Sequence, residues 1–228
     1  GGLASSVSDL LRWARFQLGG GDGLLPAEAL HRMRERTVEL RASSLGDGFG
    51  ICWFLHDLDG LHGIGHGGSG NGQFAELLIV PERGFAVVSL ANAGPDGYAF
   101  NQSVVRWVLE HCLGVVEKTA EPSRTTRAGD RRSLAATRST PWTSTSPPTA
   151  PASPCGRDQA GDPRGVGGGH APDHPAAGIG FLPGDADEYI VTEGGLKGQR
   201  GYFSRDASGA VTGVDLAGRL FNRVAQAS

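Results

Sequence analysis

The sequence predicts an α+β fold in which helices pack on an antiparallel sheet. Three observations favour it: apolar residues near the start follow helical spacing, those in the middle form short runs separated by turns, and helical spacing then returns. Helices, then consecutive strands, then a returning helix are typical of a sheet covered by helices. The 228 residues, 39% of them hydrophobic, are enough for one or two domains with a substantial core.

The first expected helix begins after Ser6. Serine is a favoured N-cap, and Asp9 stands three residues further on, in a position like that of a capping box. The glycine triplet at 19–21 ends the helix. The apolar residues that follow helical spacing between these signals are Val7, Leu10, Leu11, Ala14 and Leu18.

Two further helices are expected. A short one starts at Pro26, a favoured first-turn residue, and buries Leu30 and Met33. The other follows the strands and ends at Gly114, and its apolar residues are Val104, Val105, Val108, Leu109 and Cys112. The tryptophans of the patterned elements, which we interpret as core aromatics, are Trp13, Trp53 and Trp107.

Between these helices the pattern is extended. The expected strands are Phe49 to Leu55, His62 to His66, Phe74 to Val80 and Phe85 to Ala91. Turn residues separate them: Asp59-Gly60, then a glycine cluster, then the segment PERG at 81–84. Short apolar runs joined by such turns indicate an antiparallel meander.

The chain divides into three segments: 1–117 is well patterned, 118–178 is not, and pattern returns over 179–228. The large apolar residues between 119 and 178 are Leu134, Trp142, Cys155 and Val166. That is too little apolar surface to offset the entropy cost of ordering the segment. We expect either a disordered linker or a frameshifted stretch of a GC-rich gene, and both explanations stay open. Short apolar runs predict a small β-rich extension over 179–228.

Composition excludes several classes of function. A net charge of −3 argues against nucleic-acid binding, and no apolar run approaches the roughly 20 residues that a membrane helix needs. Three widely spaced cysteines (Cys52, Cys112 and Cys155) predict neither a disulfide framework nor a zinc site, and we interpret them as buried or incidental thiols. The chain begins Gly1-Gly2-Leu3, without an initiator methionine or signal peptide. We therefore expect a piece of a longer protein, whose location in the cell stays open.

The strongest functional signal is His66-Gly67-Gly68-Ser69-Gly70-Asn71-Gly72, at the end of an expected strand. Glycines remove side chains and let another backbone approach closely. A substrate lying along this edge would accept a hydrogen bond from the Ser69 N–H, which is half of an oxyanion hole. His66 would donate to a substrate carboxylate or join a proton relay. A glycine-rich hairpin loop with a surface histidine is the alternative interpretation of the same residues.

A series of motifs occurs in order over residues 1–115. They are GGLASSVSDLLRWARFQL (1–18), LLPAEALHRM (24–33), DGFGICWF (47–54) and GIGHGGSGNGQFAELLIVPERGFAVVSLANA (63–93), followed by a helix. The series resembles the C-terminal part of the β-lactamase-related serine hydrolases, a superfamily that joins class C β-lactamases, penicillin-binding DD-peptidases and esterases. The tail GYFSRDASGAVTGVDLAGRLFNRV (201–224) is similar to the β-rich C-terminal extension of many of these hydrolases.

The resemblance implies the C-terminal portion of a β-lactamase/transpeptidase-like domain, and a mechanism of serine attack, acyl-enzyme formation and hydrolysis by water. His66 and Gly68 would belong to the His-Gly-Gly motif of the active-site wall, and the Ser69 backbone N–H would be the second oxyanion donor. The residues that would line the substrate are Gly67, Gly70 and Asn71. The expected partner is a small molecule or peptide with an amide or ester bond, such as a β-lactam, a D-amino-acid peptide or a small ester. No metal or cofactor is implied, and the oligomeric state stays open.

The family's nucleophile motif, Ser-x-x-Lys, does not occur in this chain. Its two lysines, Lys118 and Lys197, have Val115 and Gly194 three residues before them. None of the three tyrosines begins the family's Tyr-x-Asn motif either. We therefore expect a fragment that carries one wall of an active site and is inactive alone. A non-catalytic protein of the same fold, which binds a ligand or a partner, is the alternative.

Overall fold

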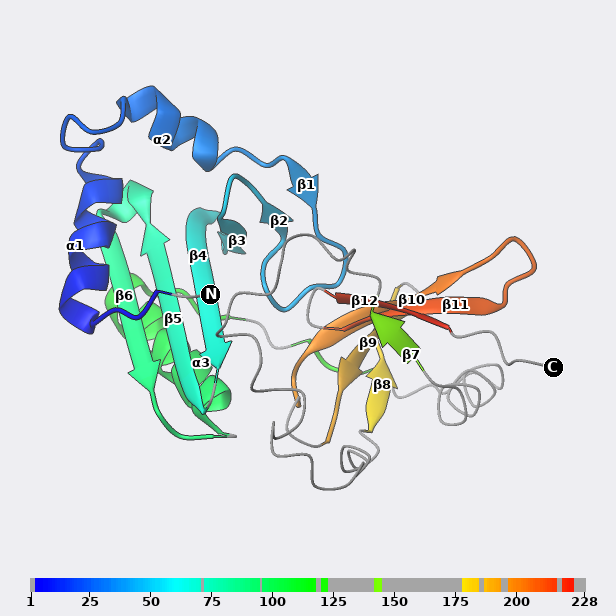
Figure 1. The fold of residues 1–228 in the computed structure, drawn as a ribbon. Coiled ribbons are helices and arrows are strands. Elements are labelled where there is room, and N and C mark those ends of the chain that lie inside the picture. Colours follow the sequence, from blue (N-terminus) through cyan, green and yellow to red (C-terminus); the bar gives the residue numbers. More distant parts are fainter. Residues whose placement is uncertain are drawn as a thin grey trace, which may run out of the picture.

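The computed structural model describes residues 3–70, 72–94, 96–117, 120–122, 142–144, 178–184, 187–193, 197–216 and 219–223. These residues form two antiparallel six-stranded sheets, one from the N-terminal part of the chain and the other mainly from its C-terminal part (Figure 1). Helices accompany the first sheet. The predicted α+β class is therefore confirmed.

The first sheet has the strand order β1-β2-β3-β4-β5-β6, so every strand pairs with its neighbour in sequence. Its strands are β1 Val38–Glu39, β2 Gly48–Phe49, β3 Phe54–Leu58, β4 Leu61–Gly70, β5 Gln73–Val80 and β6 Phe85–Ala91. The short 3₁₀ helix η1 (Pro81–Arg83) joins β5 to β6 and ends at Gly84, whose φ of +56° suits glycine. The predicted meander is present.

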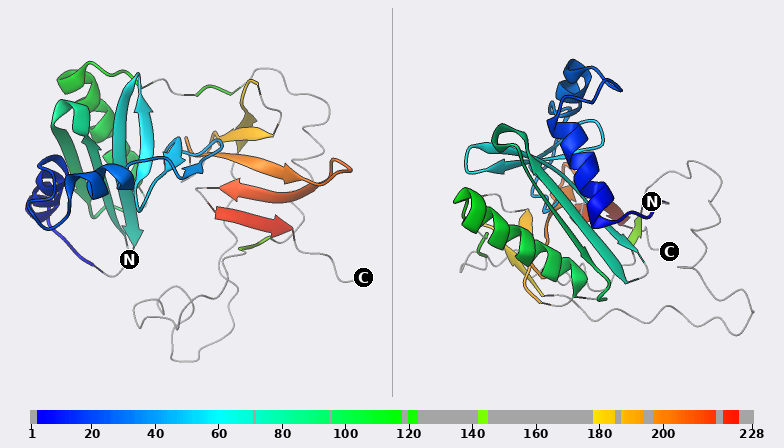
Figure 2. Two further views of the ribbon diagram at one scale, coloured as in Figure 1. Left: turned by 90° about the horizontal axis from the view of Figure 1, so that it is seen from above. Right: turned by 90° about the vertical axis from the view of Figure 1, so that its left-hand side faces the viewer.

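The helices of this part are α1 Val7–Leu18, α2 Ala27–Met33 and α3 Gly97–Val108, and α3 continues into a π-helical turn, η2 Leu109–Leu113. Helices α1 and α3 lie on opposite faces of the sheet (Figure 2). Side chains alternate along β5, so Leu77 and Ile79 pack with Ala14 of α1, whereas Leu78 and Val80 pack with Val105 of α3. Because both faces are covered, residues 77–80 are buried without a polar interruption.

The N-terminus of α1 is capped as its sequence predicts. The Asp9 N–H donates to Ser6 Oγ at 3.2 Å, and the Ser6 hydroxyl donates to the Asp9 carboxylate at 2.9 Å. The buried face differs from the expected one, because Ala14 and Gln17 are buried whereas Val7 is 41% exposed. Helix α2 begins at Ala27, one residue after the predicted start, and Pro26 is its N-cap. Helix α3 begins at Gly97, well before the first residue of the predicted apolar pattern.

The expected strand from Phe49 to Leu55 was wrong, because the segment is two short strands joined by a tight turn. Gly48 pairs with Leu55 and Phe49 pairs with Phe54. The Gly50 N–H donates to the Trp53 oxygen at 2.8 Å to close the turn. Cys52 has a φ of +62°, which a strand residue does not adopt. The apolar run therefore reverses direction instead of extending.

Two of the three predicted core tryptophans are on the surface. Trp53 is 4% exposed, but Trp13 is 42% and Trp107 is 60% exposed. Trp107 stacks instead on His111, with ring centroids 4.3 Å apart. The thiols of Cys52 and Cys112 are exposed, which excludes the buried alternative for them and leaves the interpretation as incidental thiols. Cys155 lies outside the described residues.

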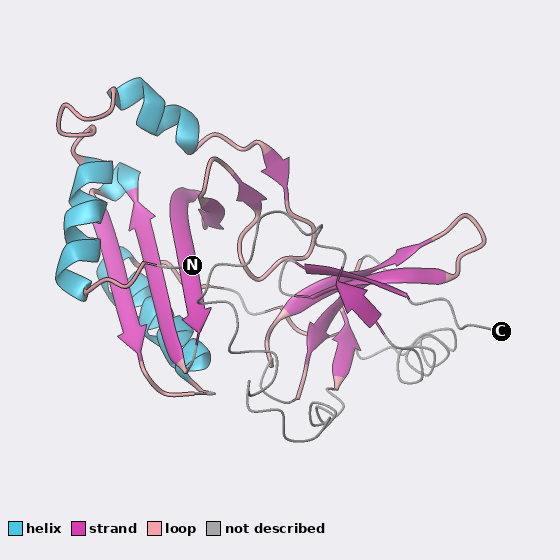
Figure 3. Ribbon diagram, viewed as in Figure 1, coloured by secondary structure: helices cyan, strands magenta, loops and turns pink. Residues whose placement is uncertain are grey.

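The second sheet has the order β7-β12-β11-β10-β9-β8. Its strands are β7 Trp142–Ser144, β8 Ile179–Phe181, β9 Glu188–Val191, β10 Arg200–Arg205, β11 Val211–Leu216 and β12 Arg219–Arg223. In the part of the chain that the structure describes, no helix accompanies this sheet (Figure 3). Its buried cluster consists of Phe181, Tyr189, Val191 and Phe203. The predicted turn at 194–195 lies outside the described residues.

Most of segment 118–178, predicted to be a linker or frameshifted stretch, lies outside the described residues. Within it, strand β7 pairs antiparallel with β12, where Trp142 lies opposite Arg223. Neither explanation for this segment is tested by these residues. The division into 1–117, 118–178 and 179–228 therefore stays a prediction.

Polar contacts join the two sheets through the loop that follows β1. The Arg200 N–H donates to Ser44 Oγ, and its guanidinium donates to the Ser43 oxygen, both at 2.7 Å. Arg41 contacts the Glu188 carboxylate at 3.3 Å, and its guanidinium lies 4.8 Å from the centre of the Tyr202 ring. The described helices include none that is long and apolar enough to cross a membrane.

Candidate active site

Strand β4 pairs with β3 along its first half and with β5 along its second half, and the two pairings overlap at Ile64 and Gly65. Residues 61–65 pair with β3 on one side, where Leu61 lies opposite Leu58 and Gly65 lies opposite Phe54. The pairing with β5 on the other side continues from Ile64 to Gly70. Among the described residues, 66–70 therefore have no strand on the β3 side. Backbone groups along such an edge are available to an extended ligand.

All the described residues of the predicted site lie on this second half of β4. His66, Gly67, Gly68, Ser69 and Gly70 are consecutive in the strand and exposed. Asn71, the last residue predicted to line the substrate, lies outside the described residues. The structure therefore places His66 to Gly70 on one exposed strand edge and not in a loop, and this placement does not decide between the two interpretations of these residues.

His66 is held by its own strand. Its Nδ1 lies 2.6 Å from the Gly67 carbonyl oxygen, and since a carbonyl only accepts, Nδ1 carries a proton. Nε2 is then the acceptor of the neutral ring. The ring also lies against Phe54, with centroids 5.2 Å apart. This orientation leaves the imidazole at the rim of the edge, where a substrate group would reach it.

Gly68 and Gly70 leave the backbone of this edge uncovered. A Cβ added at Gly70 would meet no atom within 4 Å, and one added at Gly68 would meet only the Ala75 Cβ at 3.8 Å. Packing therefore does not require glycine at these two positions. Glycine there keeps space open for a chain or ligand that lies beside the strand.

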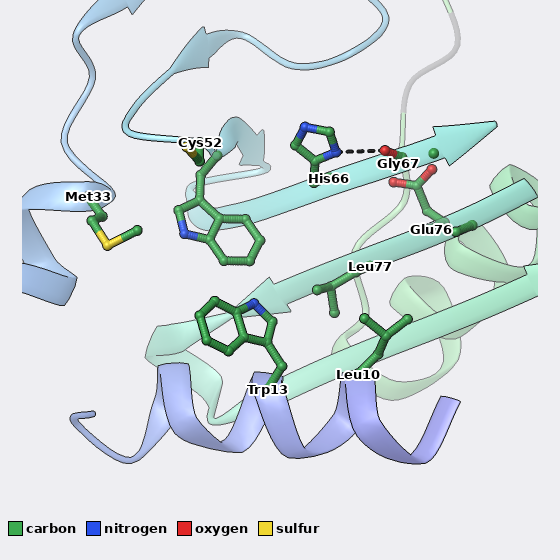
Figure 4. A pocket seen from close by; sticks show the side chains of 11 residues that line it. Leu10, Trp13, Met33, Cys52, His66, Gly67, Glu76 and Leu77 are labelled. Carbon is green, nitrogen blue, oxygen red and sulfur yellow. Dashed lines mark hydrogen bonds between the residues drawn. The ribbon is translucent and has the colours of Figure 1, made fainter. Parts of the chain in front are cut away.

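A cavity of about 310 Å³ lies beside this edge (Figure 4). Its apolar wall comes from α1, α2, the turn after β2 and β5, in the residues Leu10, Trp13, Met33, Cys52, Trp53, Ala75 and Leu77. The other lining residues are His66, Gly67, Gly68 and Glu76. The indole nitrogen of Trp53 is buried and has no hydrogen-bond partner among the described residues. Apolar walls with a few polar groups at one end are typical of small-molecule sites.

Glu76 is a lining residue that the sequence reasoning missed. It lies on β5 directly opposite Gly67, and its Oε2 accepts a hydrogen bond from Gln102 of α3 at 3.0 Å. Burial raises the pKa of its carboxyl from 4.5 to about 7, and the Gln102 hydrogen bond partly opposes that shift. The available sequence signal was a single acidic residue in the apolar run from Phe74 to Val80, which places a carboxyl inside a covered strand.

No group of three His, Cys, Asp or Glu side chains in the described part of the chain is arranged to hold a metal ion. The site consists of a strand edge, a histidine, a buried carboxyl and an apolar cavity. Such an arrangement can orient an acyl group and stabilise negative charge on it, but it contains no activated nucleophile.

Comparison with known proteins gives a consistent result. Residues 1–106 match the family model described as beta-lactamase. Over 122 residues the chain is 33% identical to penicillin-binding protein 4 of Amycolatopsis lactamdurans. The aligned region covers 50% of this chain and 32% of that protein. The chain therefore spans about a third of the length of this relative.

Two solved structures share the fold. A crystal structure of SurE with D-Leu superposes with a TM-score of 0.61 at 21% identity, over 96% of this chain and 50% of that one. A second crystal structure of SurE gives a TM-score of 0.59, also at 21% identity, over 96% of this chain and 48% of that one. At this identity the likeness concerns the fold alone.

Proposed function

We propose, from the match of residues 1–106 to the β-lactamase family, that this chain forms one wall of a serine hydrolase active site. The observation that carries the proposal is the change in pairing along β4. From His66 to Gly70 the strand is exposed and, within the part of the chain that the structure describes, has a partner on one side only; Gly68 and Gly70 leave its backbone bare. A substrate that lies along this edge is held by backbone hydrogen bonds as an added strand would be.

Each residue of the edge has a proposed role. The Ser69 N–H donates to the carbonyl oxygen of the scissile bond and stabilises the negative charge that develops there during attack. His66 takes part in proton transfer through Nε2, or, with both ring nitrogens protonated, donates from Nε2 to a substrate carboxylate. Gly67, Gly68 and Gly70 admit the substrate backbone. The neighbouring cavity receives an apolar group of the substrate, because most of its wall is apolar.

The reaction requires a serine that this chain does not supply. In the proposed mechanism, a serine oxygen attacks the carbonyl carbon, the amine or alcohol leaves with a proton, and water then cleaves the acyl-enzyme. Ser-x-x-Lys and Tyr-x-Asn do not occur in the 228 residues, so the nucleophile and base come from sequence beyond them. Alone, the chain is proposed to be inactive.

The proposed substrate is an amide or ester: a β-lactam, a D-amino-acid peptide or a small ester. The 33% identical relative is a penicillin-binding protein, which favours the first two classes. The presence of D-Leu in one of the two SurE structures also favours a group of D configuration, although that likeness concerns the fold alone.

Covalent labelling tests the proposal. The complete gene product and this chain alone are incubated with a fluorescent β-lactam and, separately, with an activated ester. We expect a covalent adduct on the complete gene product, on a serine of a Ser-x-x-Lys motif, and none on the chain alone. A complete gene product without Ser-x-x-Lys, or one that neither reagent labels, would contradict the proposal.

A binding protein is the second candidate. The cavity is present in a chain that lacks the nucleophile motif, and its wall includes the buried Trp53 and the half-exposed Trp13. Such a protein would hold the same ligands reversibly. Tight reversible binding by the complete gene product without any adduct would favour this candidate over the hydrolase.

A further inference from the structure

The carboxyl of Glu76 lies against the active-site wall from the side of α3. A Cβ added at Gly67 would lie 3.0 Å from its Oε2, so the carboxyl occupies the space that any other side chain at position 67 would take. Gly67 and Glu76 are direct partners in the β4–β5 register. The carboxyl is therefore next to the backbone that continues into Gly68 and Ser69.

Gln102 holds the carboxyl in this position. Its Nε2 donates to Glu76 Oε2 at 3.0 Å across the interface between α3 and the sheet. Among the described residues, no cationic side chain forms an ion pair with Glu76. The carboxyl therefore has a hydrogen-bond donor to orient it but no counter-charge to keep it ionised.

The other titratable and charged groups around it lie on three sides. On β3, the His56 ring lies over Gly65, on the same face as the carboxyl, and burial lowers the pKa of this histidine while Asp47 opposes the shift. On β4, His66 is in the neighbouring position. On α3, burial raises the pKa of Tyr98, a hydrogen bond with Gln199 opposes that shift, and the charges of Glu76, Glu117 and Arg106 make smaller contributions.

We propose that Glu76 is a positioning residue of the active-site wall, and that the electrostatic environment of the β4 edge changes according to whether this carboxyl carries a proton. The effect of this charge on catalysis rests on the proposed function, because it requires that Ser69 binds an oxyanion. When the carboxyl is neutral, the edge accepts the developing oxyanion at Ser69 without opposition. When it is ionised, a negative charge beside Gly67 opposes that oxyanion.

The physical basis is the burial of an uncompensated acid. Burial raises the pKa of Glu76 to about 7, so the carboxyl changes charge close to neutral pH. Glu76→Gln keeps the shape of the side chain and a partner for Gln102, but it carries no charge at any pH. This variant represents the neutral state of the wall permanently.

The test is an NMR titration of this chain from pH 5 to pH 9, which needs no catalysis. The signals followed are the Glu76 side-chain carbon and the backbone amides of Gly67, Gly68 and Ser69. We expect these amides to shift with the same midpoint as the carboxyl, near pH 7. In Glu76→Gln this pH-dependent shift of the three amides is lost. A shift that persists in the variant does not come from Glu76.

Two further variants sharpen the test. Glu82→Gln removes an exposed carboxylate from the turn after β5, where Glu82 contacts His62 at 2.7 Å, and it leaves the pH-dependent shift intact. Gln102→Leu removes the hydrogen bond that favours the ionised form, so the midpoint moves to higher pH, even if Glu76→Gln does not fold. A Glu76 carboxyl that titrates near 4.5, or amides of 67–69 that do not follow it, would overturn the inference. Because acylation is not measured, this failure is distinct from a failure of the proposed function.

Discussion

The two halves of strand β4 lie in different surroundings, although they form one continuous strand. From Leu61 to Gly65 it pairs with β3, with β5 joining on the other side from Ile64, and Ile64 is 3% exposed. From His66 to Gly70 it pairs with β5 alone and is exposed. Both halves contain glycine, so the same residue type occurs in two opposite environments of one strand.

The surroundings of these glycines separate packing from function. A Cβ at Gly63 would lie 2.9 Å from Leu58 Cδ1, and one at Gly65 would lie 2.9 Å from the Leu77 carbonyl oxygen. A Cβ at Gly70 would meet nothing within 4 Å. Close packing against backbone thus requires glycine at 65 and against the end of the Leu58 side chain favours it at 63, whereas Gly70 has no packing reason. An open backbone without a structural reason supports the assignment of the second half to ligand binding.

The largest expected effect is the loss of Ile64 from the buried half. Ile64→Ala removes apolar contacts with the cluster that contains Trp53 and Leu77, and should lower the free energy of unfolding by about 2–5 kcal/mol. Ser69→Ala, in the exposed half, should change it by less than about 0.5 kcal/mol. Urea unfolding followed by far-UV circular dichroism measures both. Equal losses of unfolding free energy in the two variants would contradict the contrast between the two halves of β4.

The second effect depends on pH and comes from Glu76, at the boundary of the halves. Burial raises the pKa of its carboxyl from 4.5 to about 7, so the folded state binds more protons than the unfolded state between these values. Stability attributable to this group is therefore complete below pH 4.5 and falls as pH rises towards 7. The loss is on the order of 2 kcal/mol after a discount for partial exposure.

The measurement is the difference in unfolding free energy between the wild type and Glu76→Gln at several pH values. The wild type should lose stability relative to the variant from pH 4.5 to pH 7, and the difference should then become constant. A difference that is independent of pH over this range would show that the carboxyl ionises alike in both states.

The third prediction compares two glycines directly. Gly65→Ala forces a methyl group against the Leu77 backbone, which should destabilise the fold by about 1–3 kcal/mol. Gly70→Ala meets open space, so its effect should be within about 0.5 kcal/mol and can be slightly stabilising through the unfolded state. Thermal melts of the two variants under the same conditions provide the comparison. A destabilising Gly70→Ala would give that glycine a packing role after all.

Local signals predicted the parts of the fold that depend on local chemistry. Ser6 and the glycines after Leu18 placed both ends of α1, because caps act within one turn. The turn at 50–53 was missed because Cys52 adopts a φ of +62°, and a cysteine in the sequence does not indicate a positive φ. The buried face of α1 was also misjudged: Gln17 is 1% exposed because the fold covers it, although its amide has no partner among the described residues.

The site divides in the same way. His66 to Gly70 were predicted as one edge because they are consecutive in sequence, so a single strand keeps them together. Glu76 and Gln102 were missed because their contact joins β5 to α3 across 26 positions of sequence. The depth of the Glu76 carboxyl depends on how α3 covers the sheet, which is a property of tertiary packing that no local pattern contains.

The backbone N–H of Ser69 offers the most direct test of the proposed oxyanion side. In the complete gene product, Ser69→Pro removes this donor and keeps an extended backbone, whereas Ser69→Ala removes only the hydroxyl. The rate of labelling by a fluorescent β-lactam is compared for variants whose thermal melts match that of the wild type. We predict a loss of roughly 10²–10³-fold for Ser69→Pro and near-wild-type labelling for Ser69→Ala. A folded Ser69→Pro protein that is labelled at the wild-type rate would contradict the assignment of β4 as the oxyanion side of the site.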